Sequence, residues 1–164
     1  MKNAFLAAIL AAFLASPALA ATFNIPDTNP LATVTVPDKD WEATKIDRGI
    51  ELETDDDEVY LSIEAVELKD LKQIVAQAIV VMQRGGVTVD LSTERQTSGN
   101  LLGHQYDDIG WKGKDKDGDV MIHLGVLTVN ASNAIMFTYW ASPDGDKQYD
   151  PVIRKIIESL KLSK

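Results

Sequence analysis

Apolar and polar residues alternate between residues 58 and 67, in the stretch EVYLSIEAVE. A period of two places successive side chains on opposite faces of a strand. This stretch is therefore predicted to be a strand with one buried face. Two later stretches, residues 120–129 and 134–141, are apolar at nearly every position. That pattern predicts two strands whose faces are both covered.

The period changes after residue 67. Apolar residues recur at steps of three and four across residues 68–82, with Lys, Asp and Gln on the other side, which predicts an amphipathic helix. Residues 84–86, Arg-Gly-Gly, supply a cation for the last turn and a glycine that can take a positive φ. A second helix is predicted at the C-terminus, with Asp150 as its N-cap and Pro151 at its first position.

Four other segments complete the pattern. The proline-containing stretch at residues 21–32 is predicted to be an irregular lead-in. Short strands are predicted at residues 33–36, at either side of a break within 41–53, and at 100–112. At that break Gly49 is expected to take a positive φ.

These elements predict an α+β fold. A sheet covered on two faces needs a layer above it and a layer below it. We therefore expect a three-layer α/β/α sandwich, with a mainly antiparallel sheet of about six or more strands and two main helices. Residues 100–112 and 120–129 are expected to form a hairpin that places Trp111 opposite Ile122.

The first twenty residues have the features of a secretory signal peptide. A lysine at position 2 precedes an uncharged apolar run at residues 4–15, and Ala-Leu-Ala at 18–20 matches the cleavage pattern. The run is shorter than the roughly 20 residues that span a bilayer. We expect cleavage after Ala20, a single domain over residues 21–164, and a periplasmic or secreted location.

Charge and cysteine content narrow the function classes. The chain has 25 acidic and 16 basic residues and a formal net charge of −9, which disfavours nucleic acid and anionic membranes as partners. It has no cysteine, so disulfides and thiol catalysis are excluded. No second apolar stretch of spanning length follows, so we expect no membrane insertion after cleavage. We also expect a monomer.

The stretch KGKDKDGDV, residues 112–120, carries Asp115, Asp117 and Asp119 at alternate positions, a spacing that calcium loops use. The calcium-loop pattern also requires Gly at its sixth position and Glu at its twelfth. Counted from Asp115, those positions are Val120 and Val126. Because Asp-Gly is a preferred hairpin corner, an acidic turn explains the stretch better than a metal site does.

A weak calcium or manganese site remains the alternative interpretation. A second acidic run, ETDDDE, occupies residues 53–58. If the fold brings this run beside residues 115–119, the two loops together could bind a divalent cation weakly. Apart from that alternative, we expect no cofactor.

Only two histidines are present. The expected hairpin places His104 opposite Val129 and His123 about 20 Å further along the neighbouring strand, so the two histidines cannot act together. The G-x-S-x-G, H-E-x-x-H and phosphate-loop patterns are also missing. A hydrolase that uses an unrecognised carboxylate stays open as a further alternative.

Large aromatic rings fill cores or line binding surfaces. Trp41 and Trp111 are expected in the core, whereas either role is open for Trp140. We take Trp140 and His123 as candidates for a ligand or partner surface.

Two long stretches of the chain resemble a known family. TVTVPDKDWEATKIDRGIELETDDDEVYLSIEAVE and AIMFTYWASPDGDKQYDPVIRKIIESLKL are similar to the opening and the close of PsbP-like domains, including a final strand, an Asp-Gly turn and a terminal helix. The resemblance implies an α/β/α sandwich on an antiparallel sheet. The group includes a photosystem II extrinsic subunit, a Ran-binding protein and exported bacterial proteins, so it implies binding and no particular activity.

Together these observations predict an exported, non-catalytic binding or accessory protein. Its partner would be an unidentified protein or small ligand.

Overall fold

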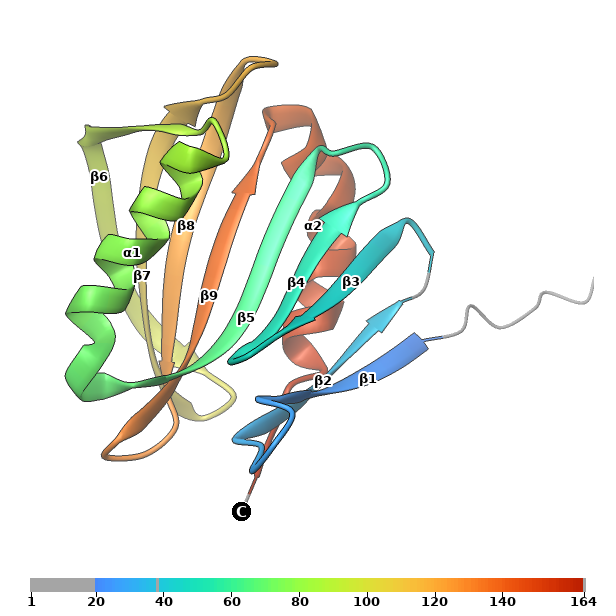
Figure 1. The fold of residues 1–164 in the computed structure, drawn as a ribbon, viewed down its shortest axis with the longest axis vertical. Helices are drawn as coiled ribbons and strands as arrows, with labels where there is room; N and C mark the ends of the chain where they lie inside the picture. The colour runs from blue at the N-terminus through green and yellow to red at the C-terminus, as the bar shows by residue number, and fades with distance from the viewer. Residues whose placement is uncertain (1–19, 38, 164) are drawn as a thin grey trace, which may run out of the picture.

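The computed structural model describes residues 20–37 and 39–163. Two α-helices, a short 3₁₀ helix (Leu68–Asp70) and ten strands make up most of this part of the chain (Figure 1). The helices are α1 (Leu71–Arg84) and α2 (Pro143–Glu158). The strands are β1 (Ala20–Ile25), β2 (Ala32–Pro37), β3 (Trp41–Ile46), β4 (Gly49–Thr54), β5 (Val59–Glu67), β6 (Thr88–Leu101), β7 (His104–Lys114), β8 (Asp119–Thr128), β9 (Asn133–Ala141) and β10 (Lys161–Leu162).

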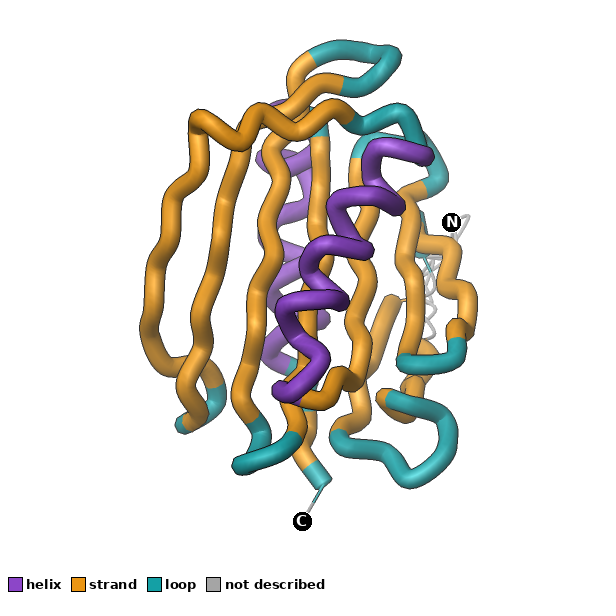
Figure 2. The backbone as a smooth tube through the Cα atoms, turned by 60° about the vertical axis from the view of Figure 1, so that its left-hand side comes forward, coloured by secondary structure: helices purple, strands orange, loops and turns teal. Residues whose placement is uncertain are grey.

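The strands form two antiparallel sheets. The larger sheet has seven strands in the order β3-β4-β5-β9-β8-β7-β6, and the smaller has three in the order β1-β2-β10. The helices α1 and α2 lie on opposite faces of the larger sheet (Figure 2). The predicted α/β/α sandwich with two helices and a mainly antiparallel sheet is confirmed. The smaller sheet is an addition that shares the layer of α2 and packs on the same core.

Each face of the larger sheet has its own apolar core. The face toward α2 packs the central strands against the helix and against the smaller sheet, through side chains that include Ile63, Phe137, Ile153, Ile156 and Val34. The face toward α1 packs Met82 against β7 and β8, through Trp111, Val120, Ile122 and Leu124. Trp41 and Trp111 are both 6% exposed, so their predicted place in the core is confirmed.

The predicted hairpin register is also confirmed. β7 and β8 pair antiparallel, with Trp111 opposite Ile122 and Tyr106 opposite Leu127. Residues 115–118 form the tip. The apolar patterns of β7 and β8 and the Asp-Gly corner therefore agreed on one pairing, as happens when local signals support the same structure.

Two strand predictions were wrong. Residues 100–112 are not one strand, because Leu102 and Gly103 take φ of 54° and 82° and turn the chain between β6 and β7. Neither β6 nor β1 was expected. β6 is mostly exposed and carries no regular apolar alternation. β1 does alternate, with Ala21, Phe23 and Ile25 less exposed than Thr22 and Asn24, but the prolines that follow it favoured an irregular segment.

The predicted start of the terminal helix was wrong as well. α2 begins at Pro143, and the Ser142 hydroxyl caps it by accepting a hydrogen bond from the Gly145 amide at 2.9 Å. The Asp-Gly turn expected from the family resemblance is the first turn of this helix. Pro151, the expected first residue, lies inside the helix and leaves the Lys147 carbonyl without its usual amide partner.

Two segments, Ser142-Pro143 and Asp150-Pro151, have the sequence of a helix start. Packing explains why the helix begins at the earlier one. Tyr149, which the later start would leave outside the helix, is 7% exposed and meets Trp41 edge to face with ring centroids 5.7 Å apart. Its hydroxyl also donates to Asp56 at 2.8 Å. Gly145 is buried against Glu58. These tertiary contacts favour a helix that begins at residue 143.

Two expectations for β4 and β5 also need correction. β5 is covered on both faces, because Ser62 and Glu64 are 1% and 8% exposed on the face expected to meet solvent. Gly49 does not take a positive φ. A glycine is required at position 49 because a Cβ there would lie 1.9 Å from the carbonyl oxygen of Ile63 on β5.

The predicted signal peptide falls outside the described residues, except for Ala20, which begins β1 and pairs with Pro37. Among the residues that the structure describes, neither helix is both long and apolar enough to cross a membrane.

Candidate binding cleft between α1 and the sheet

A cleft of about 480 Å³ lies between α1 and the larger sheet. It forms because α1 covers one side of that face and leaves β3, β4 and β5 beside it without a helix in front (Figure 1). Its walls come from α1, from the β3–β4 turn and from β4, β5 and β9. The volume falls within the range of small-molecule sites, roughly 300–1,000 Å³.

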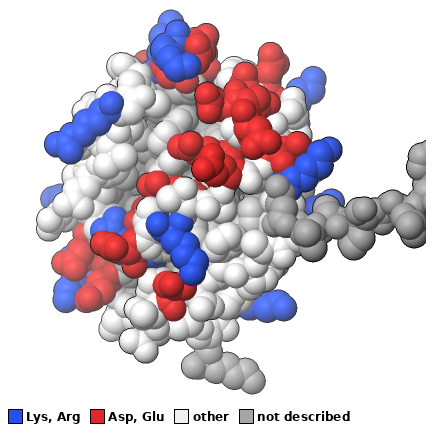
Figure 3. Space-filling view, turned by 45° about the vertical axis from the view of Figure 1, so that its right-hand side comes forward, with Lys and Arg blue, Asp and Glu red and all other residues white. Residues whose placement is uncertain are grey.

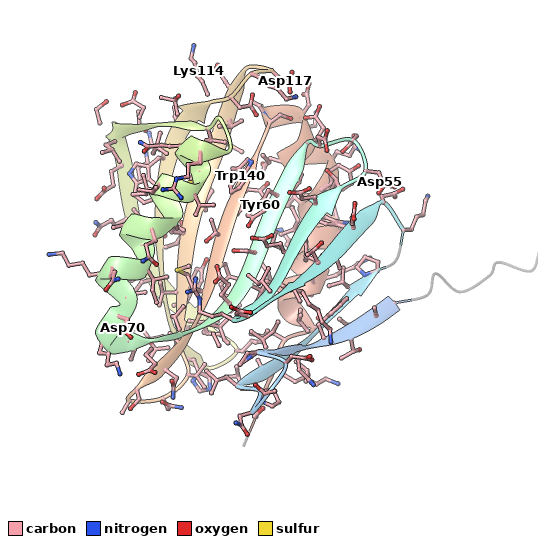
Figure 4. The ribbon with its side chains drawn as sticks, viewed as in Figure 1. Asp55, Tyr60, Asp70, Lys114, Asp117 and Trp140 are labelled. Atoms are coloured by element: carbon pink, nitrogen blue, oxygen red, sulfur yellow. The ribbon has the colours of Figure 1, made fainter. Side chains whose placement is uncertain are left out.

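A stacked aromatic pair lines the cleft. Tyr60 and Trp140 are cross-strand partners on β5 and β9, and their rings stack with centroids 3.7 Å apart and planes 11° apart. Figure 4 shows both side chains beside α1, near the middle of the sheet. Both rings are half-buried. The pair therefore offers a flat, amphipathic surface to a ligand.

The Tyr60 hydroxyl is held by Glu51 on β4. It donates a hydrogen bond to Glu51 Oε1 at 2.9 Å. Burial raises the pKa of Tyr60, and the bond to the Glu51 carboxylate raises it further. Tyr60 is consequently protonated at neutral pH and remains a donor, while Glu51 Oε2 accepts no hydrogen bond from the described residues.

An ion pair lies further along the same face of the sheet. Arg48 Nη2 lies 2.7 Å from Glu64 Oε2, and its Nε donates to the same oxygen at 2.8 Å. The Glu64 side chain is 11% exposed and that of Arg48 is 48% exposed. A carboxylate so well buried needs its cation, because an uncompensated charge there would be costly.

Thr138 on β9 contributes a hydroxyl without a partner. The residue is 5% exposed, lines the cleft and lies directly across from Ser62 on β5. Among the described residues, its Oγ1 is the only buried side-chain nitrogen or oxygen that makes no hydrogen bond. Buried polar groups are nearly always satisfied, by protein, water or ligand. This atom is thus a candidate contact for whatever occupies the cleft.

The helix supplies an apolar wall. Ile74, Ala78 and Val81 of α1 line the cleft together with Met136 of β9, and Ile74 and Met136 belong to one buried apolar cluster. Val81 is 54% exposed, an unusual position for a large aliphatic side chain, and its neighbour Val80 is 43% exposed. An apolar ligand surface placed against Val81 would remove this side chain from water.

The two residues expected to form a ligand surface lie apart. Trp140 lines the cleft, whereas His123 is on the face toward α2, opposite Tyr139 on β9. His123 Nδ1 is 3.0 Å from Asp108 Oδ2, and this hydrogen bond raises the pKa of His123. His123 therefore belongs to a different surface and takes no part in the cleft.

The acidic hairpin tip has the hydrogen bonds of a turn. Asp115 Oδ1 accepts from the amides of Asp117 and Gly118, at 2.8 and 3.0 Å. Asp117 pairs with Lys116, and Asp119 Oδ1 lies 3.5 Å from Lys114 Nζ. No group of three or more metal-ligating side chains is placed to hold an ion within residues 20–37 and 39–163. Metal binding at this tip stays a prediction.

The two acidic loops nevertheless lie close together. Side chains of Asp56 and Asp57 share a depression of about 420 Å³ with residues 115–119. Figure 4 labels Asp55 and Asp117 at the same end of the molecule, and Figure 3 shows acidic side chains gathered on that part of the surface. Asp56 already accepts the hydrogen bond from Tyr149, and Glu58 pairs with the Ser142 hydroxyl.

Comparison with known proteins agrees with this architecture. The structure superposes on cyanobacterial PsbP (CyanoP) from Synechocystis sp. PCC 6803 with a TM-score of 0.57 at 14% identity, over 89% of this chain and 94% of that one. The chain has the PsbP-like fold. LpqN of Mycobacterium tuberculosis, described as involved in cell envelope biogenesis, superposes with a TM-score of 0.54 at 11% identity, over 88% and 92% of the two chains.

Sequence comparison adds nothing to this result, since no family model and no curated protein matches the chain. Identities of 14% and 11% establish the PsbP-like fold and no activity. The site must therefore be judged from its own residues.

Several cleft residues were not predicted. Glu51, Tyr60 and Val81 reach the cleft from separate segments, so no single pattern marks them. Ser62 and Thr138 did leave a signal, because they are polar residues in the middle of apolar strands. A polar residue at a buried strand position needs a partner, and that requirement could have drawn attention to this face.

Proposed function

We propose that this protein is a non-catalytic binding protein that takes a small ligand into the cleft between α1 and the sheet. The observation that carries the proposal is the buried Thr138 hydroxyl, which lacks a partner in the described structure and lines a cleft of about 480 Å³. The stacked rings of Tyr60 and Trp140 stand in the same wall. Ligand sites typically place polar groups beside apolar and aromatic surface, and this cleft combines both kinds of lining.

The chemistry of the lining favours recognition over catalysis. Burial keeps Tyr60 protonated, so this hydroxyl is a poor general base. Glu64 is held by Arg48 and cannot turn freely toward a substrate. The side chains that remain can orient a ligand through hydrogen bonds and stacking.

We also propose that the protein acts outside the cytoplasm. The signal-peptide pattern of residues 1–20 supports this location. Similarity to LpqN, a protein involved in cell envelope biogenesis, supports it as well. The mass of the exported protein tests it. A chain that begins at Ala21 is expected, and a mass that still includes residues 1–20 would contradict export by cleavage.

A screen of small molecules against the ¹⁵N-labelled protein tests the binding proposal. Ligands should shift the signals of Ser62, Thr138 and the Trp140 indole together. Val81→Trp places a large ring at the mouth of the cleft and should abolish those shifts. Val80→Trp is the matched control, since Val80 is an exposed neighbour outside the cleft lining, and it should leave binding within about twofold.

Two results would contradict the proposal. One is a screen in which the cleft signals respond to no compound. The other is a ligand that binds equally well to the wild type and to the Val81→Trp variant, because such a ligand must sit elsewhere.

A further inference from the structure

The charges around the cleft are unequal, and this inequality bears on the kind of ligand. Three acidic residues, Asp47, Glu51 and Glu64, line the cleft together with one basic residue, Arg48. The charge of Arg48 is already matched by Glu64. Asp47 and Glu51 make no ion pair with any residue in the described part of the chain. The cleft therefore presents a net negative field to a ligand.

The neighbouring strand extends this field. Glu42 on β3 lies directly opposite Glu53 on β4, and both border a small depression that Glu51 also lines. Like charges directly opposite each other on a sheet are destabilising. Figure 3 shows acidic side chains gathered on the side of the molecule it draws. A bound positive charge near Glu51 would relieve this repulsion.

Acidic residues alone would not identify a site, but the cleft has an independent feature. The Thr138 hydroxyl is buried and without a partner in the described structure, a few residues from Trp140 in the same wall. The residue opposite Thr138 on β5, Ser62, does not bond to this hydroxyl, because the Ser62 hydroxyl donates only to Glu64, at 3.4 Å. A ligand with a polar group is the simplest partner for it.

The uncharged lining defines the rest of the ligand. Ile74, Val81 and Met136 form an apolar surface that a bare metal ion could not use. The rings of Tyr60 and Trp140 attract cations through their π-faces. Glu51 holds Tyr60 through one oxygen and keeps the other free for an ammonium group.

These features point to one ligand class. We propose that the cleft selects a small organic cation, an amine with an apolar body, whose ammonium group pairs with Glu51 and whose body rests on Trp140 and Val81. This inference rests on the proposed function, since it names the ligand class for the same cleft.

Three compounds of one shape test the charge preference. They are 3-phenylpropylamine, 3-phenylpropanol and 3-phenylpropionate, which are a cation, a neutral molecule and an anion at pH 7. Each is titrated into the ¹⁵N-labelled protein at low salt, and the dissociation constant is read from the shifts of Ser62, Thr138 and Trp140. We expect the amine to bind at least about tenfold more tightly than the alcohol, and the carboxylate more weakly than both.

Substitution assigns the preference to one residue. Glu51→Gln should reduce the advantage of the amine over the alcohol to about twofold or less, while the alcohol binds as before. Glu53→Gln is the matched control, because Glu53 is on the same strand and outside the cleft lining, and most of the advantage should remain. The ¹⁵N spectrum of each unliganded variant shows whether it has kept its fold.

The possible failures are distinguishable. If the alcohol or the carboxylate binds in the cleft as tightly as the amine, the cation preference is refuted and the proposed binding function stands. The same holds if Glu51→Gln leaves the advantage intact. If none of the three compounds shifts the signals of the cleft residues, the proposal that the cleft binds a small organic cation is overturned.

Discussion

Replacing Thr138 by Val would remove the one buried side-chain polar atom that lacks a partner in the described structure. Val has nearly the shape of Thr and a similar preference for strands. The substitution exchanges a hydroxyl for a methyl group and leaves the backbone pairing of β9 with β5 and β8 in place. We expect the free protein to become more stable and to bind its ligand less well.

The size of the effect follows from burial. A buried hydroxyl that makes no hydrogen bond costs about 1–3 kcal/mol, and an added buried methyl group contributes about 0.8 kcal/mol. Thr138 is 5% exposed and borders a cleft from which water can approach, so the lower part of this range applies. We expect a gain of about 1–2 kcal/mol in the free energy of unfolding, or about 3–6 °C in Tm.

Urea unfolding followed by tryptophan fluorescence measures this change. The midpoint should rise while the m-value stays constant, because the surface exposed on unfolding is almost unaltered. Thr44→Val is the matched control: Thr44 is on β3 and exposed, so its substitution should change stability by no more than about 0.5 kcal/mol. A loss of stability in Thr138→Val would show that its hydroxyl is satisfied, and the main argument for the ligand site would fail.

Three further predictions concern the rest of the fold. Gly49→Ala should lower the free energy of unfolding by more than about 3 kcal/mol, as measured in urea, because the new Cβ would lie 1.9 Å from a backbone oxygen on β5. Gly99→Ala is the control, since no atom lies within 4 Å of its added Cβ, and it should lower the free energy of unfolding far less. Equal losses in the two variants would contradict this explanation. The hydrogen bond that His123 donates to the Asp108 carboxylate raises the pKa of His123 above its ordinary value of 6.5. The pair therefore contributes its full stability below pH 6.5 and loses it as the pH rises through the native pKa. Between pH 5.5 and 8.5 the wild type should therefore lose more stability than Asp108→Asn, and parallel curves would exclude the effect. Millimolar calcium or manganese should shift Tm by less than about 1 °C, since the Asp115 carboxylate already accepts hydrogen bonds from amides of the turn. A larger rise in Tm that a chelator reverses would establish the divalent-cation site.

Periodic apolar patterns predicted the central elements of the fold correctly. The strands β5, β8 and β9 and the helix α1 bury apolar faces, and burial of this kind is visible in a single segment. The strand predicted at residues 100–112 was correct only for the part that forms β7. The hairpin of β7 and β8 could even be aligned to the residue, because a one-residue slip would turn every apolar side chain to the wrong face.

Elements without such a face were missed. The edge strand β6 is mostly exposed, so its extended shape depends on hydrogen bonds to β7 and leaves no trace in its own composition. The start of α2 was ambiguous because two segments, Ser142-Pro143 and Asp150-Pro151, carry the same local start signal. Contacts of Tyr149 and Gly145 with residues 41–58 decided between them.

The candidate cleft was almost invisible in the sequence. Trp140, one of the two residues singled out, lines the cleft, whereas His123 lies on the opposite face of the sheet. A ligand contact at Trp140 stays a prediction. Adjacent strands bring Glu51 to Tyr60, and they bring Tyr60 to Trp140, a residue far from it in the chain.

The sequence by itself determined which central segments bury apolar faces and how the hairpin of β7 and β8 is aligned, because both depend on residues close together in the chain. It also determined the negative charge of the molecule, which is a sum over all residues. Only the tertiary structure decided where α1 stops covering the sheet. That boundary leaves the Thr138 hydroxyl without a partner beside the aromatic pair and the Glu51 carboxylate, and it depends on how a helix and four strands pack together.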